Sequence, residues 1–284
     1  MARVRRAQPY RESGNIICRP AYALSVALFW DRLVGAQGAP PGWAIGASAV
    51  VAVAIVASPR LWRLARIVIT IAHEGGHAVA SLLSGRRLDG IRLHADTSGE
   101  TVTRGRHTGP GIVVTAFAGY VTPPLLGAGA AALLAAHRVT LLLSLFLLLL
   151  VGTLLMVRNW YGMLAVLVTG GSLFAVSWLA NPALRAGFAY GVVWFLLFGG
   201  LRPVAELARM RTAGVRLPPG RRLAAGRAGA GVSDADQLAA LTRIPRGLWV
   251  ALFALVAAGA LVLGARLLVP WPVHLPSLGP LNGK

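Results

Sequence analysis

The stretch Ile67–Leu83 reads IVITIAHEGGHAVASLL and contains the pattern H-E-x-x-H at residues 73–77. On a helix, residues four apart lie one turn apart on the same face, so His73 and His77 can bind one metal ion. Glu74 follows the first histidine and can act as general base on a metal-bound water. Zinc suits such a site because it accepts nitrogen and oxygen ligands and keeps one position open for water.

The residues around the motif are almost all apolar. Three ionisable side chains within an apolar span are costly, and such groups usually serve a function. The alternative is that two histidines merely pack beside a glutamate on a helix face. We predict a zinc site inside a membrane, with His73 and His77 as ligands and Glu74 as the catalytic base.

Composition indicates the class of protein. The chain has 284 residues, 56% of them hydrophobic and 13% charged, whereas about 25% of residues are charged in an average protein. Apolar runs long enough to cross a bilayer recur along the chain. We therefore predict an all-α polytopic membrane protein with about seven (six to seven) transmembrane helices, whose partner is the lipid bilayer.

The net charge of +19 could suggest a nucleic-acid partner. The arginines, however, lie mainly between the apolar runs, as positive-inside anchors do, so we expect no nucleic acid. Cys18 is the only cysteine, which leaves no disulfide framework and no cysteine-based zinc cluster.

The chain divides into three predicted parts. Residues 1–42 form a basic, cytoplasmic N-terminal segment, residues 43–269 a membrane-embedded domain that contains the H-E-x-x-H motif, and residues 270–284 a tail. The double proline Pro123-Pro124 predicts a break or kink in the third span. The predicted spans are about 43–57, with a start a few residues earlier, 61–83, 111–136, 139–157, 160–180, 186–201 and 248–268.

Two polar segments within this domain have predicted structure. In residues 86–110, the alternating patterns at 91–94 and 101–104 flank a turn signal and predict a β-hairpin. Residues 202–246 are predicted to be a cytoplasmic loop, with Ser233 as the N-cap of a short helix. Arginines concentrate in the segments that are inside if the N-terminus is cytoplasmic and the C-terminus external. The zinc then lies near the cytoplasmic surface, and water reaches it from that side.

A zinc H-E-x-x-H helix near the cytoplasmic face, followed by a glycine and a β-hairpin, resembles the site-2 protease family of intramembrane zinc metalloproteases. The chain is most similar to the short bacterial branch of that family, which lacks a PDZ domain. The resemblance implies a protein of the bacterial cell membrane that hydrolyses peptide bonds of transmembrane protein substrates. It also implies Zn²⁺ held by His73, His77 and a distant aspartate, with Glu74 activating water. The resemblance extends to residues 117–120 (FAGY), 123–124 (PP), 158–162 (RNWYG) and 233–235 (SDA).

The third ligand departs from the better-known members, which carry it in an L-D-G segment of a later span. The only L-D-G here, residues 88–90, directly follows the motif helix. We predict Asp234, because it precedes the last span; it could instead be only a first-turn acid beside the Ser233 N-cap. Asn159 could orient the substrate or the site, or be an ordinary turn residue, and His94 and His107 are expected on loop surfaces. The other candidates for the third ligand are Asp89, Asp96, Glu100, Glu206 and Asp236.

A helical substrate hides its peptide bonds and must unwind before cleavage. The predicted hairpin could hold it extended by strand addition. Two other classes of function stay open: a structural or silent zinc site, marked by a fourth protein ligand in place of water, and a transporter, which need not hold stoichiometric zinc. The substrate and the oligomeric state stay open.

Overall fold

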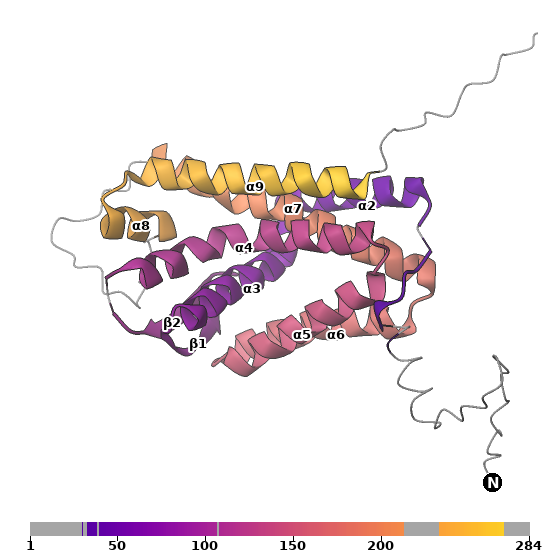
Figure 1. Cartoon of the computed structure of the whole chain (residues 1–284), viewed down its shortest axis with the longest axis horizontal. Helices are drawn as coiled ribbons and strands as arrows, with labels where there is room; N and C mark the ends of the chain where they lie inside the picture. The colour runs from indigo at the N-terminus through magenta and orange to yellow at the C-terminus, as the bar shows by residue number, and fades with distance from the viewer. Residues whose placement is uncertain (1–29, 31–32, 39, 107, 213–232, 270–284) are drawn as a thin grey trace, which may run out of the picture.

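The structure, a computed structural model, describes residues 30, 33–38, 40–106, 108–212 and 233–269. The helices form an elongated bundle, and α8 and the hairpin lie at the same end of it (Figure 1). The two strands pair in antiparallel fashion, which confirms the predicted hairpin. All the other described elements are helices, which confirms the predicted helical class. In chain order the elements are α2 (Gly42–Ala57), α3 (Pro59–Leu83), β1 (Arg87–Leu93), β2 (Gly99–Arg104), α4 (Pro110–Ala135), α5 (Val139–Met156), α6 (Trp160–Leu179), α7 (Pro182–Thr212), α8 (Asp234–Thr242) and α9 (Arg246–Leu268).

The helices α4, α5, α6, α7 and α9 are each long and apolar enough to cross a membrane. The helices α2 and α3 pass the same test only as a pair, which is bent by 102°. With 16 residues, α2 rises about 24 Å, less than the roughly 30 Å of a hydrocarbon core. Arg60, Arg63 and Arg66 lower the hydropathy of α3. The described residues thus form five spans, or six when the bent pair is one span, which is the lower end of the predicted range.

The path of the chain bears on the predicted sides. The first helix, α2, begins and the last helix, α9, ends at the end of the bundle opposite α8 and the hairpin (Figure 1). If the α2–α3 pair is one span, the described helices cross the membrane six times, and the start of α2 and the end of α9 lie on the same side. The N-in, C-out prediction instead assumed seven crossings. Residues 1–29 and 270–284 lie outside the described residues, so the cytoplasmic N-terminus stays a prediction.

The double proline does not break its helix. The helix α4 is continuous from Pro110 to Ala135 with Pro123 and Pro124 inside it, so of the predicted break or kink the break is wrong. Both prolines are buried, and a Cβ atom on Gly200 of α7 would lie only 2.8 Å from the Cδ of Pro124. A proline inside a helix leaves a backbone carbonyl without its usual donor. Close packing against Gly200 buries this part of α4 in protein, as membrane proteins require.

Two helix boundaries also differ from the prediction. The first span does not start before Trp43 by several residues, because α2 begins at Gly42 directly after Pro41. The helix α7 continues to Thr212, well past the predicted end at 201. An ion pair between Arg202 and Glu206, one turn apart, supports this extension.

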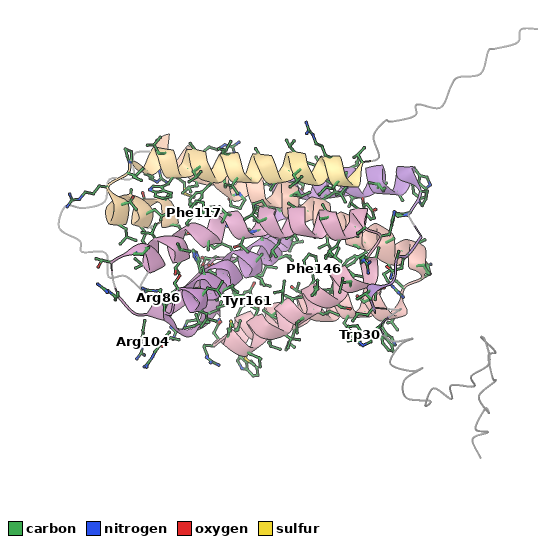
Figure 2. The ribbon with its side chains drawn as sticks, viewed as in Figure 1. Trp30, Arg86, Arg104, Phe117, Phe146 and Tyr161 are labelled. Carbon is green, nitrogen blue, oxygen red and sulfur yellow. The ribbon has the colours of Figure 1, made fainter. Side chains whose placement is uncertain are left out.

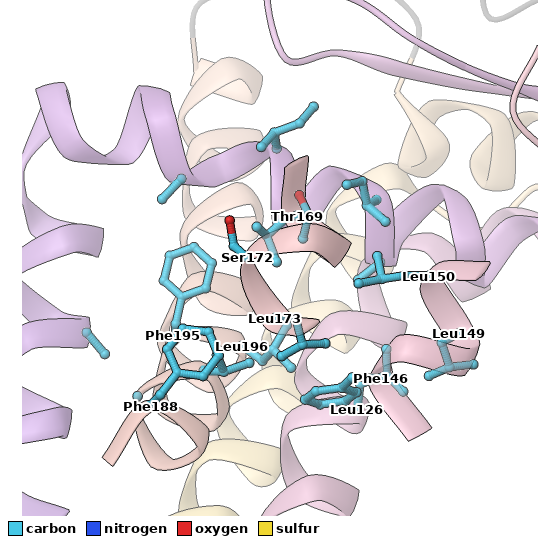
Figure 3. Close-up of a pocket in the computed structure, with 18 of the residues that line it drawn as sticks. Leu126, Phe146, Leu149, Leu150, Thr169, Ser172, Leu173, Phe188, Phe195 and Leu196 are labelled. Carbon is cyan, nitrogen blue, oxygen red and sulfur yellow. The ribbon is translucent and has the colours of Figure 1, made fainter. Parts of the chain in front are cut away.

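A cavity lies between the α5–α6 pair and the helices α2, α3, α4 and α7. Its volume is about 1560 Å³, and Phe146, Leu173 and Phe195 are among the side chains around it (Figure 3). Gly75 and Val79 of α3 also line it, whereas no motif histidine does. The motif helix therefore turns one face to apolar space and the opposite face to α4 and α8.

Candidate metal centre

The motif helix places its two histidines together. The Nε2 atoms of His73 and His77 are 3.1 Å apart, as expected for residues one helical turn apart. The Nδ1 atom of His77 lies 2.6 Å from the Thr115 carbonyl oxygen. A carbonyl oxygen only accepts, so Nδ1 carries the proton and Nε2 of the neutral ring keeps its lone pair for a metal.

Asp234 completes a triangle with these histidines. Its Oδ2 atom is 3.2 Å from the Nε2 atom of His73 and 3.2 Å from that of His77. Two ligands about 2.0–2.1 Å from a tetrahedral zinc ion are roughly 3.3 Å apart, so the triangle has the size of one tetrahedral face. Oδ2 is also buried without a hydrogen-bond partner among the described residues. The donor set therefore fits a metal ion.

The electrostatics agree with this fit. Burial alone would raise the pKa of the Asp234 carboxyl, but positive charge on the neighbouring imidazoles, chiefly His77 in its protonated form, outweighs burial and holds that pKa well below its usual range. A metal ion bound at the same nitrogens would supply positive charge in the same place. The side chain is therefore an ionised carboxylate. Two imidazole nitrogens and one carboxylate oxygen are the ligands of many catalytic zinc sites. Within the described part of the chain, no fourth histidine, cysteine, aspartate or glutamate joins the cluster.

The helix α4 approaches the histidines through a glycine. A Cβ atom on Gly119 would lie 2.4 Å from the Nε2 of His77 and 2.7 Å from the Cε1 of His73. Tyr120 packs edge-on against the ring of His73, with centroids 4.9 Å apart. Phe117 packs against aromatic rings of α9 (Figure 2). The FAGY stretch thus joins α4 to the centre and to α9.

The helix α8 carries Asp234 in its first turn. Ser233 is its N-cap and forms a capping box with Asp236, which confirms the predicted helix start. Asp236 also pairs with Arg246 of α9 at 2.8 Å. Ala235 and Leu238 are fully buried against α4, α7 and α9. The cap, the ion pair and this packing together fix the backbone beside Asp234.

Glu74, next to His73 in the chain, contacts the hairpin. It is only 4% exposed, and the Thr101 hydroxyl donates to its Oε2 at 2.6 Å. A Cβ atom on Gly99 would lie 2.6 Å from its Oε1. The contacts of Thr101 and Gly99 with Glu74 are not predictable from the sequence, because strand alternation shows which residues share a face but not which helix that face meets.

The hairpin is held from its other side by the α5–α6 junction. The Oδ1 of Asn159 accepts from the Leu93 N–H at 3.1 Å, and its Nδ2 donates to the Leu93 carbonyl at 2.6 Å. The N–H of Arg158 donates to the Ile91 carbonyl. Of the two roles left open for Asn159, the structure supports an orienting one, although the group it orients is the strand β1.

The other candidate ligands lie elsewhere. Asp89 pairs with Arg104 at 2.6 Å, and Asp96 bonds to Ser98 in the hairpin turn. His94 is exposed, as predicted, and His107 lies outside the described residues. The remaining acids are Glu100, in a polar pocket with three arginines, Glu206, paired with Arg202, and Asp236, paired with Arg246.

Comparison with known proteins identifies the family. The sequence profile of the Peptidase M50B-like family matches residues 46–264. No curated protein and no solved structure matches the chain. The matched region contains the motif helix, the hairpin, α8 and nearly all of α9, and it agrees with the site-2 protease resemblance. The chain therefore belongs to the Peptidase M50B-like family and is an integral membrane metallopeptidase.

Proposed function

We propose that this protein is an intramembrane zinc endopeptidase that cleaves transmembrane protein substrates, with His73, His77 and Asp234 as zinc ligands and Glu74 as general base. The triangle of ligand atoms with 3.1–3.2 Å sides is the observation that carries the proposal. A structural zinc site would have a fourth protein ligand, and the described residues offer none at the cluster. A transporter has no need of this tetrahedral donor set.

When bound, zinc supplies a Lewis acid that acidifies water and polarises the scissile carbonyl. Glu74 accepts the proton of the attacking water and then delivers it to the leaving amine. The Thr115 carbonyl fixes the tautomer of His77, which keeps the Nε2 lone pair of that ring directed at the metal. The buried apolar residues of α4 and α9 around α8 limit water at the site.

The hairpin offers one edge to an extended substrate. The outer edge of β1 is occupied, because Ile91 bridges to Val157 and Leu93 bonds to Asn159. Among the described residues no strand pairs with the outer edge of β2, so we propose that edge for strand addition. The strand β2 also contacts Glu74 through Thr101. A segment paired with β2 would lie next to the base, with its peptide bonds exposed.

We place the hairpin and α8 on the cytoplasmic side, which puts the start of α2 and the end of α9 on the external side (Figure 1). This placement agrees with the predicted external C-terminus but not with a cytoplasmic start of the first predicted span. The described arginines concentrate at the hairpin end of the bundle, as the positive-inside rule requires of cytoplasmic segments, whatever the number of spans. Arg138, Arg185 and Arg266 lie toward the opposite end. The arginines at the hairpin end include Arg86, Arg87, Arg92, Arg104, Arg106, Arg158, Arg243 and Arg246.

The test compares wild type, Glu74→Gln and His77→Ala. Each variant is purified for metal analysis and co-expressed with candidate single-span membrane proteins. Glu74→Gln should keep about one zinc per chain and lose roughly 10²–10⁴-fold of the cleavage rate, because the amide cannot accept a proton. His77→Ala should lose both zinc and cleavage. Wild-type cleavage by zinc-loaded Glu74→Gln, or no change in the processing of any membrane protein, would overturn the proposed function.

A further inference from the structure

We infer that Thr101 is a positioning residue for Glu74, so that the hairpin fixes the orientation of the carboxylate that acts as general base. The inference rests on the proposed function and adds to it a residue that neither binds the metal nor reacts. It follows from the way in which β2 lies on the motif helix.

Alternate residues of the hairpin contact one face of α3. The Thr70 hydroxyl donates to the Thr97 carbonyl at 2.8 Å, and Thr101 bonds to Glu74 one helical turn further along. Gly99 and Thr101 are two apart on β2 and share the face that meets Glu74, and Thr70 and Glu74 are four apart on α3 and share a face of that helix. The turn and the strand are therefore in register with Thr70 and Glu74, and this register brings Thr101 to the carboxylate.

The hydroxyl of Thr101 has one proton and two possible acceptors on Glu74. The Oε2 atom of the side chain is 2.6 Å away and the backbone carbonyl oxygen is 3.1 Å away. The shorter distance is in the range of a charge-assisted bond to a carboxylate, so we assign the proton to Oε2. Because threonine is branched at Cβ, its side chain has few rotamers, and the hydroxyl stays directed at that oxygen.

Gly99 limits the other side of the same carboxylate. A Cβ atom there would lie 2.5 Å from the Cγ and 2.6 Å from the Oε1 of Glu74. The hairpin thus contacts both oxygens, through a hydrogen bond on one and close packing on the other. A base that must meet a water in one geometry gains from such restraint, since misplacement of a reacting group by about 1 Å can cost 10²-fold in rate.

The experiment removes the hydroxyl and keeps the shape. Thr101→Val should lower kcat by roughly ten- to a hundredfold, the size expected for a lost hydrogen bond to a charged group. KM and zinc content should stay at wild-type values, because the residue binds neither substrate side chains nor metal. Thr101→Ser, which restores the hydroxyl, should recover most of kcat. The probe is the single-span protein that accumulates uncut with Glu74→Gln.

Two further variants distinguish an effect on the orientation of Glu74 from an effect on the stability of the hairpin. Thr103→Val removes a hydroxyl from the same strand, one that accepts from Arg86 at 3.2 Å and not from Glu74, and its loss of kcat should be much smaller. Gly99→Ala should lower kcat with zinc retained, because the methyl group displaces the carboxylate. The inference is overturned if Thr101→Val keeps wild-type kcat while Glu74→Gln is inactive, if it matches Thr103→Val, or if it loses zinc. Wild-type cleavage by Glu74→Gln would instead refute the proposed function.

Discussion

Replacing Gly119 with alanine is a direct test of the metal centre. The added Cβ atom would lie 2.4 Å from the Nε2 and 2.5 Å from the Cε1 of His77, and 2.7 Å from the Cε1 of His73. Carbon atoms in contact are normally about 3.5–4.0 Å apart, so the rings or α4 must move by roughly 1 Å. Zinc–ligand distances vary by only about ±0.2 Å in good sites. We therefore expect Gly119→Ala to weaken zinc binding by at least the 10–100-fold that changes in outer-shell partners cause.

The assay is competition for zinc between the purified protein and a chelator of known affinity. Gly129→Ala is the matched control, because Gly129 lies in the same helix and a Cβ atom there has nothing within 4 Å. The control should bind zinc like wild type. Thermal unfolding of both metal-free proteins shows whether α4 still packs. If folded Gly119→Ala binds zinc as tightly as Gly129→Ala, the cluster described here is not the metal centre.

The two glycines inside the motif should respond oppositely to alanine in thermal unfolding. Gly75→Ala has open space around it and should change stability by no more than about 1 kcal/mol, in the favourable direction. Gly76→Ala should destabilise by about 1–3 kcal/mol, because its methyl group would lie 2.3 Å from a hydroxyl oxygen of α4; equal melting temperatures would contradict this packing. Asn159→Ala leaves the N–H and the carbonyl of Leu93 in β1 without their partner, at a cost of roughly 1–3 kcal/mol, and should speed proteolytic cutting of the hairpin. Cutting at the wild-type rate would show that Asn159 does not hold the hairpin in place. Ser98→Cys in a Cys18→Ala background should react only from the cytoplasmic side, and labelling by an impermeant reagent on intact cells would reverse the orientation.

The sequence predicts well what depends on residues close together in the chain. The spacing of His73 and His77 fixes their common face because helix geometry is local. The cap of α8 is local too, since Ser233 and Asp236 are three residues apart. Asp234 could only be a candidate, because its approach to the histidines depends on how α8 packs against α4, α7 and α9.

The errors come from packing between helices. The double proline Pro123-Pro124 predicts a break or kink, but α4 is continuous there. Gly200 has no side chain, so α7 packs closely against Pro124, and no local sequence pattern shows that contact. The α2–α3 pair reads as two spans because each segment has an apolar run, but in the structure the two helices are bent by 102° and pass the length and hydropathy test only as a pair, so the number of crossings depends on the bend at Ser58-Pro59. The bond from Thr101 to Glu74 was missed for the same reason, since it joins a strand to a helix 27 residues away.

The late position of α8 in the chain has a consequence for biosynthesis. Translation runs from the N-terminus, so the motif helix leaves the ribosome well before Asp234. At about 5–20 residues per second, the interval between His77 and Asp234 is on the order of ten seconds. Throughout it, the nascent protein holds two of the three ligands and lacks the carboxylate. The proposed zinc site therefore cannot be completed, and the chain cannot cleave a substrate by the proposed mechanism, until α8 has been synthesised.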